Sequence, residues 1–219
     1  MNMWMIYRIL LLFFCTFPNV PAPLLLRKLS AGVSPLKGIA GHFAFGIHEY
    51  VPQSCKYVTI LRAPVERAIS HFDFARQGEN HYLHALASAY GASLLDYIRS
   101  PQNIDVRNGQ VLLWAGIGWG VHSGKTGEEI LERARGNLLD YFALVGIMEQ
   151  FDDFLYLIRR FFKWDIREYE KKNVNLQPTY PKDLPAATLN AIAACNRLDQ
   201  NLYEDVKKAF NNRLKLYSG

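Results

Sequence analysis

The stretch that decides the fold of this chain reads Tyr57-Val58-Thr59-Ile60-Leu61-Arg62-Ala63-Pro64-Val65-Glu66-Arg67-Ala68-Ile69-Ser70. Its first five residues, which are apolar or β-branched, predict a short buried strand. A tight turn follows, and Pro64 predicts the first position of a helix, where proline is common. Arg62 then lies at the carboxyl end of the strand, and Ser70 lies about two turns into the helix. A parallel α/β fold usually keeps its ligand at this edge of the sheet, so the stretch predicts a binding site there.

The side chains at this predicted edge suit an anion. The guanidinium of Arg62 is a planar fork that donates two parallel hydrogen bonds, which makes arginine the preferred residue for a phosphate. The hydroxyl of Ser70 is expected near the same strand end as Arg62. The pattern Leu-Arg-x-Pro also occurs at ordinary helix starts that bind nothing. The neighbouring segments therefore decide between the two interpretations.

Residues 61–70 resemble the 3'-phosphate-binding motif of sulfotransferases, L-R-D-P-x-x-R-x-x-S. The similarity points to the carbohydrate 2-O- and 6-O-sulfotransferase group and its bacterial members. It implies that Arg62 and Ser70 hold the 3'-phosphate of 3'-phosphoadenosine 5'-phosphosulfate, the sulfuryl donor. The chain departs from the motif at Ala63, where the family normally has Asp. An Asp there could cap the first helical amides, and the loss of such a cap typically costs about 1 kcal/mol.

A second segment with family resemblance precedes this motif and reads Lys37-Gly38-Ile39-Ala40-Gly41-His42-Phe43-Ala44-Phe45-Gly46-Ile47-His48-Glu49-Tyr50. It is similar to the G-H-F-x-F-G-x-H segment of the bacterial members. In the carbohydrate enzymes a His in this region is the general base for the acceptor hydroxyl, a role that suits imidazole at neutral pH. The resemblance implies His42 as the first choice for this base, because it follows an apolar run, and His48 as the second. The alternative for either residue is that it only packs or caps a turn.

Two further segments extend the resemblance toward the C-terminus, so that it covers residues 37 to 210. Phe142–Asp152 is similar to a late strand-to-helix passage of the family, and Leu198–Tyr203 is similar to its closing helix. The expected fold class is α/β. The resemblance implies a P-loop-like sulfotransferase domain at 36–219, with a parallel sheet flanked by helices, after a hydrophobic N-terminal segment at 1–35.

The main departure from the family concerns the 5'-phosphosulfate loop. Sulfotransferases of this group open with a strand and a loop of the type H-x-P-K-T-x-G-T, whose N–H groups and Lys surround the phosphosulfate. Residues 1–40 contain no such segment, so the first strand and loop are expected to be missing. The loss of one charge-stabilising donor costs on the order of 100- to 1000-fold in rate. Two functions stay open: sulfuryl transfer to a hydroxyl, expected to be that of a carbohydrate, and a truncated, inactive relative that retains at most a nucleotide site.

The triplet Gly124-Lys125-Thr126 is similar to the end of a nucleotide-binding P-loop, but the first Gly of that motif would fall at Trp119. Thr126 and Glu129 match a capping box instead. The apolar residues that follow recur at helical spacing, so this region predicts the start of an amphipathic helix.

Composition limits the partners of the chain. Its 219 residues suit one α/β domain, and with 50% hydrophobic and 21% charged residues it is globular rather than disordered. The net charge of +5 suits an anionic donor nucleotide or an acidic polysaccharide. No dense basic run or recognisable module indicates nucleic acid. The three Cys residues are scattered and the six His residues show no ligand spacing, so no metal is expected.

The apolar stretch at residues 3–17 has the profile of a signal or anchor segment, and Pro18 ends it. It is shorter than the roughly 20 residues that span a bilayer. The alternatives are a core helix and a truncated gene product. A membrane is therefore a partner only through this segment, and both cytoplasmic and membrane-associated localisation stay open.

Overall fold

The computed structural model describes residues 44–50, 56–77, 84–89, 93–101, 103, 105–117, 124, 126–164, 169, 175 and 178–217. The predicted segment 1–35, including the apolar stretch 3–17, lies outside the described residues, and so does His42. Within the described residues, no helix is both long and apolar enough to cross a membrane.

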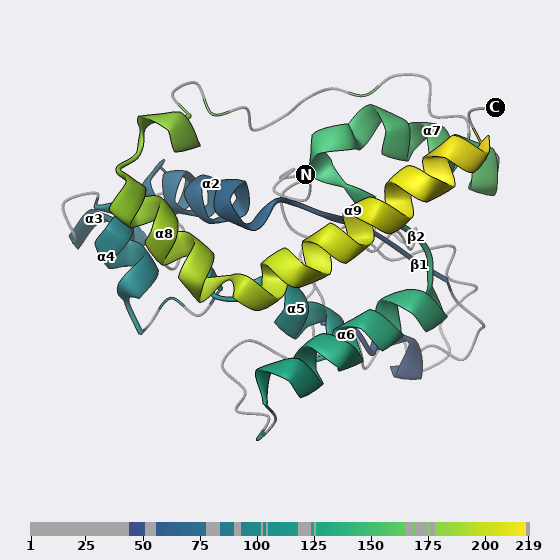
Figure 1. Ribbon diagram of the computed structural model, residues 1–219, viewed down its shortest axis with the longest axis horizontal. Coiled ribbons are helices and arrows are strands. Elements are labelled where there is room, and N and C mark those ends of the chain that lie inside the picture. Colours follow the sequence, from purple (N-terminus) through teal and green to yellow (C-terminus); the bar gives the residue numbers. More distant parts are fainter. Residues whose placement is uncertain are drawn as a thin grey trace.

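The described elements follow the order helix, strand, helices, strand, helices (Figure 1). They are η2 (Ile47–Tyr50), β1 (Tyr57–Leu61), α2 (Pro64–Gln77), α3 (His84–Ala89), α4 (Leu94–Arg99), α5 (Gly109–Trp114), α6 (Gly127–Tyr141), β2 (Phe142–Ile147), η3 (Met148–Gln150), α7 (Phe151–Phe162), η4 (Pro181–Asp183), α8 (Ala186–Cys195) and α9 (Arg197–Tyr217).

The described part of the sheet consists of β1 and β2, which pair in parallel. The register joins Tyr57 to Phe142 at one end and Leu61 to Ile147 at the other, with one irregularity after Tyr57. Every residue of β1 is buried, which explains its continuous apolar and β-branched run, because a parallel strand is covered on both faces. The predicted strand and proline-led helix at 57–70 are confirmed, and so is a mixed α/β fold with a parallel sheet.

The helices surround this strand pair. Figure 1 shows α9, drawn in yellow, as a long diagonal that passes the strands, with α7 on one side and α6 on the other. Accordingly, α9 packs against β2, α5, α6 and α7. At the end of the molecule away from the strands, α2 packs against α3, α4 and α8.

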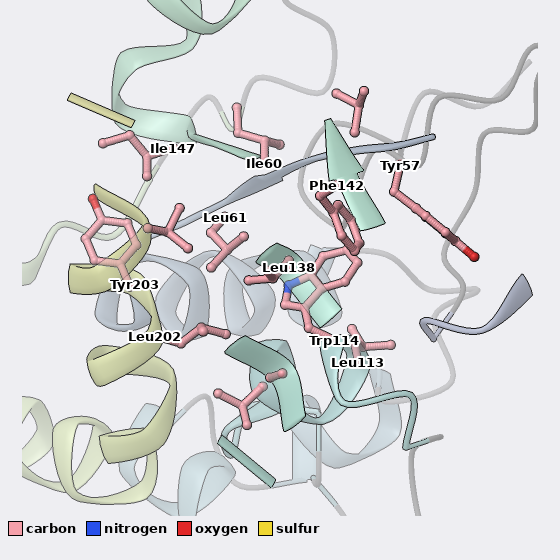
Figure 2. Close-up of a cluster of buried hydrophobic side chains, with 14 of the residues drawn as sticks. Tyr57, Ile60, Leu61, Leu113, Trp114, Leu138, Phe142, Ile147, Leu202 and Tyr203 are labelled. Carbon is pink, nitrogen blue, oxygen red and sulfur yellow. The ribbon is translucent and has the colours of Figure 1, made fainter. Parts of the chain in front are cut away.

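The main core lies between the sheet, α5, α6 and α9 (Figure 2). The indole of Trp114 meets the ring of Phe142 edge to face, with centroids 5.2 Å apart, and Trp114 is fully buried. Figure 2 also shows that Tyr57 and Phe142 lie at one end of the strand pair, whereas Ile147 and Tyr203 lie at the other. A second apolar cluster joins α2, α3, α4 and α8 and includes Ala68, Ile69, Phe72, Tyr97, Ile98 and Ile192.

The predicted capping box opens α6. The backbone N–H of Glu129 donates to the Thr126 hydroxyl, and the Glu129 carboxylate accepts the Thr126 N–H at 2.7 Å. The helix buries Ile130, Leu131, Ala134 and Leu138 on one face. Thr126 therefore caps a helix, as the sequence predicted.

Candidate functional site

The candidate site is the carboxyl edge of the strand pair, where β1 runs into α2 and β2 runs into η3. Arg62 directly follows β1 and is half-buried. Ser70 lies in the second turn of α2 and is also half-buried. The sequence predicted both positions, and the structure places Arg62 at the edge where parallel folds hold their ligands.

The turn between Arg62 and α2 is stabilised from the neighbouring strand. The backbone N–H of Ala63 donates to Oε1 of Glu149, which follows β2, at 2.9 Å. A carboxylate beside a helix N-terminus is favourable because the helix dipole places partial positive charge there. Ala63 lacks the side-chain cap of the family motif, yet its own amide has an acceptor that comes from 86 residues further along the chain.

Oε2 of Glu149 also accepts a hydrogen bond from the hydroxyl of Tyr203 on α9, at 2.9 Å. Burial raises the pKa of this phenol, and the negative charge of Glu149 raises it further. Tyr203 therefore stays protonated and acts as a hydrogen-bond donor. Through Glu149 it links α9 to the end of β2 and the start of α2.

Gln110 on α5 holds the backbone of Arg62 on both sides. Its Oε1 accepts the Arg62 N–H at 2.9 Å, and its Nε2 donates to the Arg62 carbonyl, also at 2.9 Å. Gln110 itself is 4% exposed, and the two hydrogen bonds are partly buried. The side-chain amide therefore fixes the backbone of the first residue after β1.

The helices α5 and α9 cap each other at their N-termini. The carboxylate of Asp199 on α9 accepts the backbone N–H groups of Gln110 and Val111, at 3.1 and 2.7 Å. In return, Oδ1 of Asn108, which precedes α5, accepts the N–H groups of Leu198 and Asp199, at 3.0 and 3.2 Å. Each helix thus supplies acceptors for first-turn amides that have no partner within their own helix.

The Asp199 half of this reciprocal cap lies in the interior. Asp199 is fully buried, and burial raises the pKa of its carboxyl, although the charge of Arg67 and the two amides act in the opposite direction. Asn108 takes the left-handed backbone conformation, with φ of 49°, which asparagine tolerates better than most residues.

Arg67, the second arginine of the motif, also belongs to this interior network. It is 6% exposed and donates through Nη2 to the carbonyl of Asp105 at 2.7 Å. A Cβ at Gly109 would lie 2.7 Å from the same nitrogen, so the guanidinium packs directly on the glycine backbone. These contacts give Arg67 an architectural role at the start of α5.

His48 lies at the opposite end of β1. Its Nδ1 is 2.6 Å from the Tyr57 hydroxyl, which also accepts the backbone N–H of His48 at 2.8 Å. The imidazole packs against the rings of Phe45 and Tyr141, with centroids 5.1 and 4.8 Å away. Tyr57 is five residues before Arg62 in extended chain, about 16 Å along the strand. The structure thus places Arg62 at one end of β1, with Ser70 in the second turn of the helix that follows, and His48 at the other end of β1, in contacts typical of packing.

The segment after α7 is anchored on α2, one turn beyond Ser70. The buried carboxylate of Asp73 accepts the backbone N–H and the hydroxyl of Thr179, at 2.9 and 2.8 Å, and the side-chain amide of Asn175 at 3.0 Å. This carboxylate therefore holds part of the long excursion between α7 and α8 beside the helix that carries Ser70.

Sequence reasoning missed Gln110, and it did not foresee what Glu149 and Asp199 bind. Glu149 and Asp199 lie inside segments that showed family resemblance, so their positions carried a signal, whereas Gln110 carried none. Among the described residues, no group of His, Cys, Asp and Glu side chains is arranged to hold a metal ion.

Comparison with known proteins identifies the class. Galactose-3-O-sulfotransferase 3 of Bos taurus is 29% identical over 189 residues, which are 80% of this chain and 43% of that protein. The Homo sapiens protein of the same name is 29% identical over 185 residues, or 78% of this chain and 42% of the relative. Uronyl 2-sulfotransferase of Homo sapiens is 28% identical over 174 residues, or 71% of this chain and 43% of the relative. These relatives define the class of carbohydrate sulfotransferases, which confirms the resemblance seen in the sequence.

A family model described as galactose-3-O-sulfotransferase matches residues 19–218. The chain therefore belongs to the galactose-3-O-sulfotransferase family. It spans less than half the length of the curated relatives that it matches.

Proposed function

We propose that this chain binds 3'-phosphoadenosine 5'-phosphosulfate and takes part in the transfer of its sulfuryl group to a carbohydrate hydroxyl, within a P-loop-like domain. The observation that carries the proposal is the position of Arg62. It follows a buried parallel strand and precedes a helix that carries Ser70 two turns on, in a chain of the galactose-3-O-sulfotransferase family. Arg62 and Ser70 would hold the 3'-phosphate, the first through a charged fork and the second through its hydroxyl.

The reaction needs a base for the acceptor. In the proposed step, the acceptor oxygen attacks sulfur, the bond between sulfur and the 5'-phosphate oxygen breaks, and 3'-phosphoadenosine 5'-phosphate leaves with the electron pair. The hydroxyl proton passes to a histidine. His42, which lies outside the described residues, is the first candidate, and His48 stays second because its Nδ1 contacts the Tyr57 hydroxyl. As in phosphoryl transfer, positioning and charge stabilisation would supply most of the catalysis.

The second candidate function is a nucleotide-binding relative that does not catalyse transfer. It is favoured by one sequence observation, namely that the 219 residues contain no segment of the type H-x-P-K-T-x-G-T. This relative would bind the adenosine 3'-phosphate end of the donor and leave sulfate untransferred.

Calorimetric binding tests the donor site, with 3'-phosphoadenosine 5'-phosphate compared against adenosine 5'-monophosphate. We expect tighter binding of the first, and a loss of this preference in Arg62→Ala but not in Arg99→Ala, which removes an exposed arginine on α4. Equal binding of both nucleotides to the folded wild-type chain would refute the proposal. Sulfate transfer from the labelled donor to galactose-terminated or uronate-containing glycans then separates the enzyme from the inactive relative.

A further inference from the structure

We infer that Gln110 is a positioning residue for donor binding, which fixes the backbone of Arg62 and thereby aims its guanidinium before the 3'-phosphate arrives. The inference rests on the proposed function, because it assigns Gln110 a role in the same site. It starts from the place of Arg62 in the fold. The last strand pair joins Leu61 to Ile147, so Arg62 is the first residue beyond the described ladder.

The two hydrogen bonds of Gln110 act on the backbone of this residue. Oε1 holds the N–H of Arg62 and Nε2 holds its carbonyl, each at 2.9 Å, so both peptide groups that flank the Arg62 Cα are fixed by one planar amide. With these groups held, φ and ψ of Arg62 are constrained and the direction of its Cα–Cβ bond is set. The start of α2, only two residues on, is set with it.

Gln110 is itself held rigidly. It is 4% exposed, and its backbone N–H binds the buried carboxylate of Asp199 at 3.1 Å. Asp199 in turn is held at the start of α9 by Oδ1 of Asn108, through its own N–H at 3.2 Å. A continuous set of hydrogen bonds therefore runs from the N-terminus of α9 through α5 to Arg62.

The chemistry of the clamp specifies glutamine. One side-chain atom must accept and its neighbour must donate, which a carboxylate cannot do, because Glu at this position would face the Arg62 carbonyl with a second acceptor. Asn offers the same groups on a shorter side chain. A clamp of this kind lowers the ordering that Arg62 must undergo on binding, and pre-organisation of a binding residue raises affinity.

The test uses binding of 3'-phosphoadenosine 5'-phosphate and of adenosine 5'-monophosphate, each measured by calorimetry on the full chain. The ratio of the two affinities isolates the 3'-phosphate. We expect Gln110→Ala to lower this ratio roughly 10-fold, the size of a hydrogen-bond effect. The matched control is Gln200→Ala, which removes an exposed glutamine bonded to Glu204 on α9, and it should leave the ratio unchanged.

A double variant separates positioning from general structural damage. If Gln110 acts through Arg62, Gln110→Ala should have no effect on the ratio when Arg62→Ala is already present, since interacting residues are not additive. Gln110→Glu, which keeps the volume and one acceptor, provides the same comparison should the alanine variant fail to fold. Its drop should be at least as large, because a second acceptor then faces the Arg62 carbonyl. An unchanged ratio in both Gln110 variants, or an effect that persists beside Arg62→Ala, would overturn the inference.

A different set of results would refute the proposed function. In that case the wild-type chain itself would not distinguish the two nucleotides, or Arg62→Ala would bind them as the wild type does, and the inference about Gln110 would fall with it. A wild-type preference that depends on Arg62 but not on Gln110 would refute only the positioning role.

Discussion

Replacing Asp199 with alanine tests the reciprocal cap on which the candidate site depends. Its carboxylate is buried, accepts two first-turn amides of α5, and lies near the positive charge of Arg67. Alanine would leave both amides buried without an acceptor, and each orphaned donor costs about 1–3 kcal/mol. Alanine also removes the desolvation cost of the buried carboxylate, which offsets part of this loss. We therefore expect the free energy of unfolding to fall by about 3 kcal/mol.

Urea unfolding at about pH 5 would measure this difference. The control is Asp205→Ala on the same helix, because Asp205 is an exposed partner of Arg135 and such pairs contribute less than about 1 kcal/mol. A loss of less than about 1 kcal/mol for Asp199→Ala would show that the cap does not stabilise the fold in the way that its contacts indicate.

The stability lost in Asp199→Ala should also depend on pH. Burial raises the pKa of Asp199 above its ordinary value of 3.8, so the folded state binds this proton more tightly than the unfolded state does. The contribution of Asp199 to stability is therefore complete below about pH 3.8 and declines as the pH rises through the folded pKa. The difference between the wild type and Asp199→Ala should be larger at about pH 3.5 than at about pH 7.5. A difference that grows over this range would mean that the folded pKa is lowered instead.

Two further predictions concern the neighbourhood of β2. A Cβ at Gly146 would lie 2.2 Å from the ring of Phe154, so Gly146→Ala should destabilise by about 1–3 kcal/mol in urea unfolding. Its control, Gly136→Ala on α6, adds a Cβ with no atom within 4 Å and should stabilise by about 0.5–1 kcal/mol; equal shifts would contradict the packing argument. Glu149→Gln removes the negative charge beside Tyr203 and should lower the pKa of that phenol, while burial keeps it above 10.0, as followed by NMR of labelled tyrosine. A pKa unchanged by this substitution would mean that burial alone sets it.

Local features of the fold were readable from the sequence because their causes lie within a few residues. The buried strand at 57–61 follows from five consecutive apolar or β-branched residues, and Pro64 marks the first residue of α2. The capping box at Thr126 joins residues three apart. In α9 the apolar residues recur at helical spacing from Leu198 to Phe210, and the same positions are buried.

The support of the site could not be read in this way, because its partners are distant in the chain. Gln110 and Arg62 are 48 residues apart, Ala63 and Glu149 are 86 apart, and Gln110 and Asp199 are 89 apart. A glutamine, a glutamate and an aspartate in such places resemble ordinary helix residues until the elements pack. The absence of Asp at position 63 predicted a weaker turn, and only the fold revealed that Glu149 accepts the amide of Ala63.

The sequence by itself determined the strand, the turn and the helix that carry Arg62 and Ser70, and with them the family resemblance, because hydrophobic pattern and proline stereochemistry act locally. Only the tertiary structure decided that Gln110 clamps Arg62, that α5 and α9 cap each other, and that His48 packs at the far end of β1 from Arg62. The physical reason is that buried polar groups must find partners wherever the packed elements present them, and those partners are set by the arrangement of the helices rather than by spacing along the chain.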